Sequence, residues 1–280
     1  MKISKITGTI HIDNNWSDAK DAGICTGSGI YSDPYVIENL IIDGGGTVIG
    51  ILIENSNDSF ILRNCTIYNL TYGIELDHVQ NGRLVNNNCS FNWYGIALFA
   101  SENNTLSGNI VNNNTQVGTM LYESNNCTIS GNTANYNDWN GIRLSESNNN
   151  SILENTVYNN FYGIDLEDSD NNTISGNTVN NSIEVGIDLT YSNYNTLSTN
   201  IANYNQYGIY LEHSNFNIIS GNILIKNDKC INQKEDCEGN IFENNECVKH
   251  GGIIPGYNLI VLLGIIFVVV IITRKKIKES

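Results

Sequence analysis

The stretch "YGIDLEDSDNNTISGNTVNN", residues Tyr162–Asn181, contains three short apolar–polar alternations separated by bends. In "GIDL", Ile164 and Leu166 are predicted to point inward. Asp165 and Glu167 alternate with them and point outward. "NTIS" and "TVNN" form a second and a third strand, and "DSDNN" and "GN" supply turn residues. Three strands and three bends in 22 or 23 residues predict one coil of a parallel β-solenoid.

The same unit recurs along the chain with a constant period of 22 or 23 residues. Glycines keep this period at Gly50, Gly73, Gly95, Gly118, Gly141, Gly163, Gly186 and Gly208. Asparagines keep it at Asn64, Asn87, Asn109, Asn132, Asn155, Asn177, Asn200, Asn222 and Asn245. A helical repeat would need apolar residues spaced three and four apart, and this spacing is absent. A leucine-rich repeat would need a longer series of regularly spaced leucines, which is also missing. We therefore predict an all-β, right-handed parallel β-helix of about nine or ten coils over residues 35–247.

Both columns have a structural explanation in such a fold. Equivalent residues of successive coils stack at ~4.8 Å, the spacing of neighbouring strands. An Asn at an inward bend can donate its side-chain amide to the next coil and accept one from the previous coil. The Gly column is expected at a bend where a Cβ would clash or φ is positive.

Composition limits the function classes. The 280 residues carry a formal charge of −15, which provides no basic field for a nucleic acid. Seven Cys occur without a CxxC pair, so we do not expect a structural zinc site. We predict a disulfide among Cys230, Cys237 and Cys247, with burial of three small apolar side chains as the alternative.

The two ends of the chain differ from the repeats. Residues 257–273 are apolar and long enough for one membrane span, after a linker at 248–256. The basic tail, residues 274–280, predicts a cytoplasmic C-terminus and a rod outside the membrane. Residues 1–34 are expected to form a cap and lead-in. They lack the apolar region of a signal peptide, so we expect the natural start to lie upstream, with a tail-anchored cytoplasmic rod as the alternative.

One outward strand face combines acidic and aromatic residues. Asp165 and Asp188 lie one coil apart, which places their carboxylates ~5 Å from each other, and Arg143 lies one coil before them. These three residues are the candidate catalytic group, because a retaining glycosidase uses such a carboxylate pair. Asp165, Glu167 and Asp188 are also the candidate ligands for Ca²⁺, the one cofactor considered. A solvated strand face is the alternative.

Aromatic residues on this side suit a glycan ligand. Tyr122, Tyr191 and Tyr210, together with Glu167, are the candidate ligand-binding residues, because tyrosine rings stack on sugars. Four tyrosines that precede a column Gly are expected to pack at a bend instead: Tyr72, Tyr94, Tyr162 and Tyr207. His78 and His213 share a column six coils apart and cannot share a metal.

The units "NNTISGNTVNN", "YGIDLEDS" and "NCTISGN", with the lead-in "GSGIYSDPYVIENLIIDGGG", resemble the β-helix repeats of NosD-type and carbohydrate-binding and sugar-hydrolase proteins. The whole chain resembles archaeal membrane-anchored surface proteins of this fold. The resemblance implies the fold, which carries polysaccharide lyases, hydrolases, adhesins and accessory proteins alike. The function that we expect is that of a non-catalytic surface protein that binds polysaccharide or a surface-layer protein. One alternative is a polysaccharide hydrolase or lyase. The other is an accessory protein in metal-enzyme maturation, although the scattered His, Met and Cys residues form no evident copper site.

Overall fold

The computed structural model describes residues 4–6, 8–45 and 48–248. Within these ranges no helix is both long enough and apolar enough to cross a membrane. The predicted membrane span at 257–273 and the basic tail at 274–280 lie outside the described residues, as does all but the first residue of the linker at 248–256.

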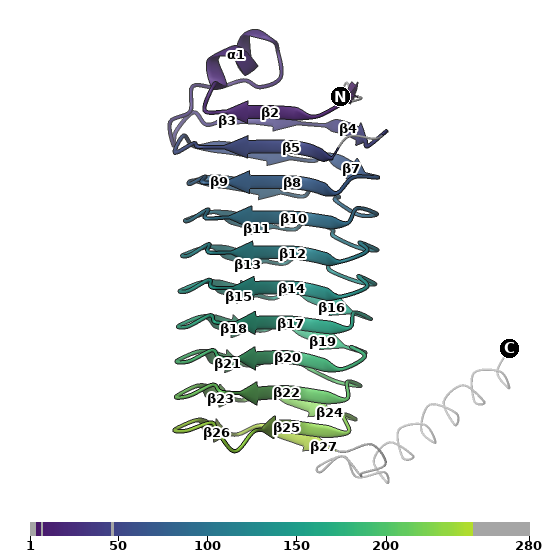
Figure 1. The fold of residues 1–280 in the computed structure, drawn as a ribbon, viewed down its shortest axis with the longest axis vertical. Coiled ribbons are helices and arrows are strands. Elements are labelled where there is room, and N and C mark those ends of the chain that lie inside the picture. Colours follow the sequence, from purple (N-terminus) through teal and green to yellow (C-terminus); the bar gives the residue numbers. More distant parts are fainter. Residues whose placement is uncertain (1–3, 7, 46–47, 249–280) are drawn as a thin grey trace, which may run out of the picture.

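The described chain winds into a rod whose coils each contribute a strand to parallel sheets (Figure 1). This confirms the predicted right-handed parallel β-solenoid. Sheet B, at the front of Figure 1, has ten strands: β2 (Ile10–Asp13), β5 (Ile49–Glu54), β8 (Tyr72–Asp77), β10 (Tyr94–Phe99), β12 (Val117–Tyr122), β14 (Asn140–Ser145), β17 (Tyr162–Glu167), β20 (Val185–Thr190), β22 (Tyr207–Glu212) and β25 (Lys229–Gln233).

The other strands lie behind sheet B. Sheet C comprises β3 (Tyr35–Glu38), β6 (Phe60–Arg63), β9 (Gly82–Val85), β11 (Thr105–Ser107), β13 (Thr128–Ser130), β15 (Ser151–Leu153), β18 (Thr173–Ser175), β21 (Thr196–Ser198), β23 (Ile218–Ser220) and β26 (Ile241–Glu243). Sheet A comprises β1 (Ser4–Ile6), β4 (Leu40–Asp43), β7 (Thr66–Tyr68), β16 (Thr156–Tyr158), β19 (Thr178–Asn180), β24 (Ile223–Ile225) and β27 (Glu246–Val248), joined in part through single bridges.

The core is a set of aliphatic columns that run along the rod. Ile164 pairs in register with its equivalents Ile142 and Ile187 on the neighbouring strands. These side chains are fully buried, as are the inward residues of sheets A and C, such as Val179 and Ile174. The period-two pattern of the sequence thus predicts the inward side of each strand correctly.

Hydrogen-bond ladders fill the inner corners between the sheets. Asn132 donates its Nδ2 to Asn155 Oδ1 at 3.0 Å and to the carbonyl of Leu106. The backbone N–H of Asn132 donates to the same Asn155 Oδ1 at 2.8 Å. The pattern repeats along the column at Asn87, Asn109, Asn132, Asn155, Asn177, Asn200, Asn222 and Asn245.

The prediction that Asn64 belongs to this column is wrong. The ladder site of that coil is Cys65, whose backbone N–H donates to Asn87 Oδ1. Asn64 itself lies one residue earlier, is exposed, and has φ of 54°. It belongs to a turn column with left-handed backbone, where Asn is favoured because its side chain bonds to nearby backbone groups.

Three further ladders occupy other inner corners and were not predicted. One joins Asn92, Asn114, Asn137 and Asn160. Another joins Cys127 and the asparagines from Asn150 to Asn240. In the third, each backbone N–H donates to a Ser hydroxyl of the next coil, from Ser101 to Ser214.

The Gly column lies at the second residue of the sheet B strands from β5 to β22, just after the bend, and its φ values are not positive. Close approach of the next coil explains it. A Cβ on Gly141 would lie 2.5 Å from Val157 Cγ1 and 2.7 Å from the carbonyl oxygen of Gly163. Of the two explanations expected for this column, the clash is correct.

Each end of the rod has its own closure. The sheets already begin at β1 and β2, before residue 35. Helix α1 (Trp16–Asp21) covers the first coil, with the Trp16 ring stacked on Tyr35 at 4.8 Å and its Nε1–H donating to Ser56. At the other end, Cys230 and Cys247 form a disulfide, and Cys237 is free.

The ladders predict that ladder asparagines contribute much more to the free energy of unfolding than exposed asparagines do. We expect Asn155→Ala to lower the free energy of unfolding by ~3 kcal/mol, because the buried backbone N–H of Asn132 loses its acceptor, and the Ile129 carbonyl and Asn177 Oδ1 each lose a donor. The matched control is Asn57→Ala, at an exposed turn, which we expect to change it by less than ~0.5 kcal/mol. Urea denaturation followed by circular dichroism measures both, and equal effects would contradict the role of the ladder.

Candidate functional site

The candidate site lies on the outer face of sheet B over β14, β17, β20 and β22. Adjacent strands bring the predicted residues together in register: Arg143 opposite Asp165, and Asp165 opposite Asp188. Tyr210 follows opposite Asp188 on β22. We call the carboxylates of Asp165 and Asp188 the acidic pair.

Both carboxyls of the acidic pair point outward but are largely covered by their neighbours. Asp165 is 9% exposed and Asp188 8%. Asp165 Oδ2 accepts a hydrogen bond from Asn140 Nδ2 at 2.8 Å and lies 3.7 Å from Arg143 Nη1. Asp188 Oδ1 accepts one from the Thr190 hydroxyl at 3.2 Å. The sequence correctly places these residues outward, and their burial follows from the large side chains beside them.

Burial changes the acid–base behaviour of the pair. It raises the pKa of Asp165 to about 6, against an opposing effect of the nearby Arg143. Burial and the neighbouring charge of Asp165 raise the pKa of Asp188 well above its usual range. The cause is that two adjacent carboxylates in a poorly solvated place cannot both ionise easily. At neutral pH the pair therefore holds protons more tightly than exposed aspartates do.

Arg143 forms ion pairs with two of the predicted site residues. Its guanidinium forms a close ion pair with Glu167 and a longer one with Asp165. Tyr210 donates its hydroxyl to Glu212 at 2.8 Å, and Tyr162 donates to Glu184 at 2.9 Å. Tyr162 was expected only to pack at a bend, yet it is part of the ring of groups around the acidic pair.

Sequence reasoning missed an aromatic ledge beside the pair, which we define as Trp93, Trp139 and Phe161. These residues occupy one column, immediately before the strands of sheet B. Trp139 and Phe161 stack with ring centroids 5.0 Å apart and planes 5° from parallel. Trp139 remains 44% exposed, so it presents a flat ring to solvent. The column was visible in the sequence as the residue two before each Gly.

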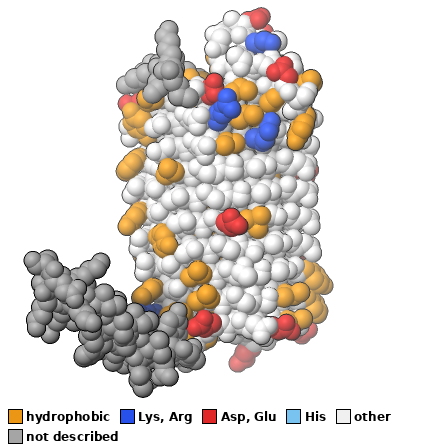
Figure 2. All heavy atoms as spheres, turned by 180° about the vertical axis from the view of Figure 1, so that it is seen from behind, with side chains coloured by type: hydrophobic (Ala, Val, Ile, Leu, Met, Phe, Trp, Pro, Cys, Tyr) orange, Lys and Arg blue, Asp and Glu red, His pale blue; other side chains and the backbone are white. Residues whose placement is uncertain are grey.

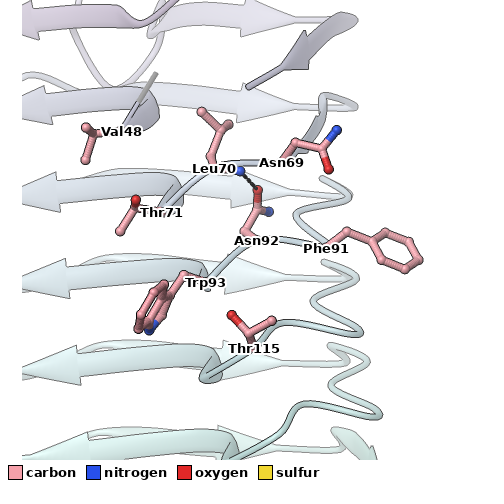
Figure 3. A pocket seen from close by; sticks show the side chains of 8 residues that line it. All are labelled: Val48, Asn69, Leu70, Thr71, Phe91, Asn92, Trp93 and Thr115. Atoms are coloured by element: carbon pink, nitrogen blue, oxygen red, sulfur yellow. Dashed lines mark hydrogen bonds between the residues drawn. The ribbon is translucent and has the colours of Figure 1, made fainter. Parts of the chain in front are cut away.

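Trp93 borders a shallow pocket at the upper end of the ledge (Figure 3). The pocket measures about 390 Å³ and is formed by the turns that precede four sheet B strands, β5, β8, β10 and β12. In Figure 3, Trp93 lies below Val48 and Thr71, whereas Phe91 points away from them. The hydrogen bond from the Leu70 backbone to Asn92 holds two of these turns together.

The other two predicted tyrosines lie farther from the acidic pair. Tyr122 is on β12, two coils before Asp165, and its hydroxyl donates to Glu146 at 3.2 Å. Tyr191 follows β20 at a left-handed turn and stacks on His213 with centroids 4.5 Å apart. Neither contacts the pair.

The opposite side of the rod has a different character. Figure 2, seen from behind Figure 1, shows a surface that is mostly uncharged, with basic and acidic side chains near its ends and an acidic side chain near its middle. Serine and threonine are frequent at the outward positions of the sheet C strands from β11 to β21. Charge and aromatic stacking are thus combined on the sheet B face.

The described residues do not assemble an evident metal centre. No group of three or more His, Cys, Asp or Glu side chains within residues 4–6, 8–45 and 48–248 is placed to hold a metal ion. His11, His78 and His213 each pair with a carboxylate, on three different coils. His250 lies outside the described residues.

The raised pKa of Asp188 predicts a stability change with a definite sign. The Asp188 carboxyl binds a proton more tightly in the folded chain than in the unfolded chain. Deprotonation of Asp188 therefore lowers the free energy of unfolding as pH rises from ~4, its pKa in the unfolded chain, through its pKa in the folded chain. We expect Asp188→Asn to raise the melting temperature at pH 7.5 by about 2–4 °C and to have little effect at pH 4. Exposed Glu154→Gln serves as the control. An equal gain for Asp188→Asn at both pH values would contradict the assignment.

Comparison with solved structures finds the same fold in proteins of low sequence identity. The Dettilon tailspike protein matches with a TM-score of 0.68 and 16% identity, over 86% of this chain and 58% of that one. The periplasmic alginate epimerase AlgG (D317A mutant) matches with 0.63 and 19%, over 75% and 59%. The A-module of the Azotobacter vinelandii mannuronan C-5 epimerase AlgE4 matches with 0.66 and 13%, over 76% and 72%.

The chain spans less than two-thirds of the length of the first two of these proteins. At such identities the likeness shows the fold alone. No curated protein matches the chain.

The family model described as "Periplasmic copper-binding protein (NosD)" matches residues 10–187 and 137–254. Copper sites in proteins use clustered His, Cys and Met ligands. The described histidines lie on separate coils and the five free cysteines, Cys237 included, are buried. No three possible ligands are grouped among the described residues, so these residues do not fit a copper centre. The match nevertheless extends over nearly all the coils, and by it the chain belongs to the NosD family.

Proposed function

We propose that the chain is a glycan-binding surface protein and that its binding site is the sheet B face around the acidic pair. The observation that carries this proposal is the stacked, half-exposed Trp139–Phe161 pair beside buried carboxylates and tyrosine hydroxyls. Sugars present apolar C–H faces to aromatic rings and hydroxyls to carboxylates, so both kinds of group suit a glycan. The alginate epimerases and tailspike among the structural neighbours support it by analogy only.

We further propose that the rod lies outside the membrane and that residues 257–273 anchor it, with the basic tail in the cytoplasm. The apolar stretch and its basic flank support this orientation. The word "periplasmic" in the family description is consistent with a rod outside the membrane. In that position the sheet B face is available to polysaccharides or surface-layer proteins.

A second candidate function is cleavage of a polysaccharide by the acidic pair. The observation in its favour is the raised pKa of Asp165 and Asp188, because a general acid must keep its proton near neutral pH. Binding is the better supported of the two, since Arg143 already engages Asp165 and Glu167. A role in metal-enzyme maturation has no donor set to support it among the described residues.

The proposal predicts that the aromatic ledge is required for glycan binding. We expect Trp139→Ala to weaken binding by about tenfold or more, through loss of one stacking surface. The measurement is a glycan-array screen of the full chain, with and without Ca²⁺, in which bound and released sugars are both recorded.

The matched control is Tyr194→Ala, which removes one ring of the exposed stacked pair Tyr194–Phe216 outside sheet B. We expect it to bind as the unmodified chain does. Equal losses in both variants, or normal binding by Trp139→Ala, would contradict the proposed site. Released sugar that disappears in Asp165→Asn would favour the enzyme instead.

A further inference from the structure

The sheet B face has an excess of negative charge centred on Asp188. Electrostatic repulsion at this carboxylate comes from Asp165, Glu184 and Glu212. On strands β14, β17, β20 and β22 the only Lys or Arg is Arg143, which pairs with Asp165 and Glu167. No ion pair to Asp188 is formed by any cationic side chain in the described part of the chain, and its hydrogen-bond partner is Thr190. Asp188 therefore lacks a counter-charge.

A second observation also indicates a missing donor at this place. Asn140 is fully buried, and its Nδ2 holds Asp165 at 2.8 Å. Its Oδ1 is buried without any hydrogen-bond partner. Buried amide oxygens almost always accept a hydrogen bond, and an unsatisfied one is costly. Asn140 lies two coils before Asp188 and is linked to it through Asp165. The line from Asn140 through Asp165 to Asp188 thus has acceptors in excess and too few donors.

We propose that this face selects glycans that carry primary amines and rejects polyuronates; the inference rests on the glycan-binding function proposed above. An ammonium group supplies three N–H donors and a positive charge, both of which the surroundings of Asp188 lack. A uronate carboxylate would bring a further negative charge to this acidic surface, and the repulsion excludes it. A neutral glycan would gain the stacking contacts but not the charge interaction.

The arrangement of the aromatic ledge gives the direction of the chain that binds. Successive coils are ~4.8 Å apart, so Trp93 lies ~10 Å from Trp139 along the rod, and Phe161 lies one coil beyond Trp139. Asp188 is on the coil after Phe161. One coil is about as long as one sugar of an extended polysaccharide. Asp188 lies four residues along its strand from the ledge column, ~13 Å at ~3.3 Å per residue. We therefore place the ligand obliquely across the strands, with rings against the ledge and an amine at Asp188.

Three oligosaccharides of equal length test this inference with the full chain in calorimetry: a glucosamine hexamer, an N-acetylglucosamine hexamer and a mannuronate hexamer. We expect the glucosamine hexamer to bind most tightly and to weaken with added salt, because the interaction is between charges. We expect the mannuronate hexamer not to bind. Preference for the N-acetylated or the mannuronate hexamer would overturn the inference while leaving glycan binding intact. Failure of all three would contradict both proposals.

Asp188→Asn isolates the charge contribution. We expect it to weaken binding of the glucosamine hexamer by about tenfold and binding of the N-acetylglucosamine hexamer by a smaller factor. Glu154→Gln removes an equal charge from an exposed turn that follows sheet C and controls for net charge. Equal losses in the two variants would show a diffuse electrostatic effect and would overturn the assignment to Asp188.

Discussion

The structure depends on the hydrogen-bond ladders at the inner corners of the coils. Wherever a coil bends inward, backbone N–H groups face an interior that is otherwise aliphatic, and each needs a partner. The Asn side chain of the next coil supplies an acceptor to that N–H, while its own Nδ2 donates to a carbonyl of the coil before. Because the same exchange is repeated along each corner, neither a Leu nor an Ala can replace these residues without leaving buried groups unpaired.

This constraint separates the positions that build the rod from those that are free to vary. Inward positions are mostly aliphatic, Asn, Ser or Gly, with a few Cys and the single Phe60 and Thr119, because packing and the ladders limit what fits there. Outward positions of sheet B have no such requirement, and one column changes from Leu52 through Ala97 and Arg143 to Asp188 and Tyr210. Function in this fold is therefore determined by the outward columns. The acidic pair is unusual among them because it combines an outward direction with burial, which destabilises the charged state.

The sequence predicts the fold because every structural requirement recurs once per coil. The register of Asp165 with Asp188 follows from counting alone, and the structure has it. Three of the four ladders were missed because Asn is so common that several columns look alike, and Asn64 was misplaced since turn and ladder asparagines are neighbours in sequence. The cap helix α1 is a single short element without a repeat to reveal it. The ledge was missed because Trp139 and Phe161 precede the strands, where no alternation marks them. The burial of the acidic pair depends on neighbours from other coils.

The central claim is that ligands bind on the sheet B face beside the acidic pair. Hydroxyl-radical footprinting of the full chain, with and without the glucosamine hexamer, tests it most directly because both faces carry exposed aromatic rings. Protection of Trp139, Phe161 and Tyr210, with Tyr194 and Phe216 unchanged, is the predicted result. Protection of Tyr194 and Phe216 instead, or equal labelling of all five rings at saturating ligand, would contradict the account.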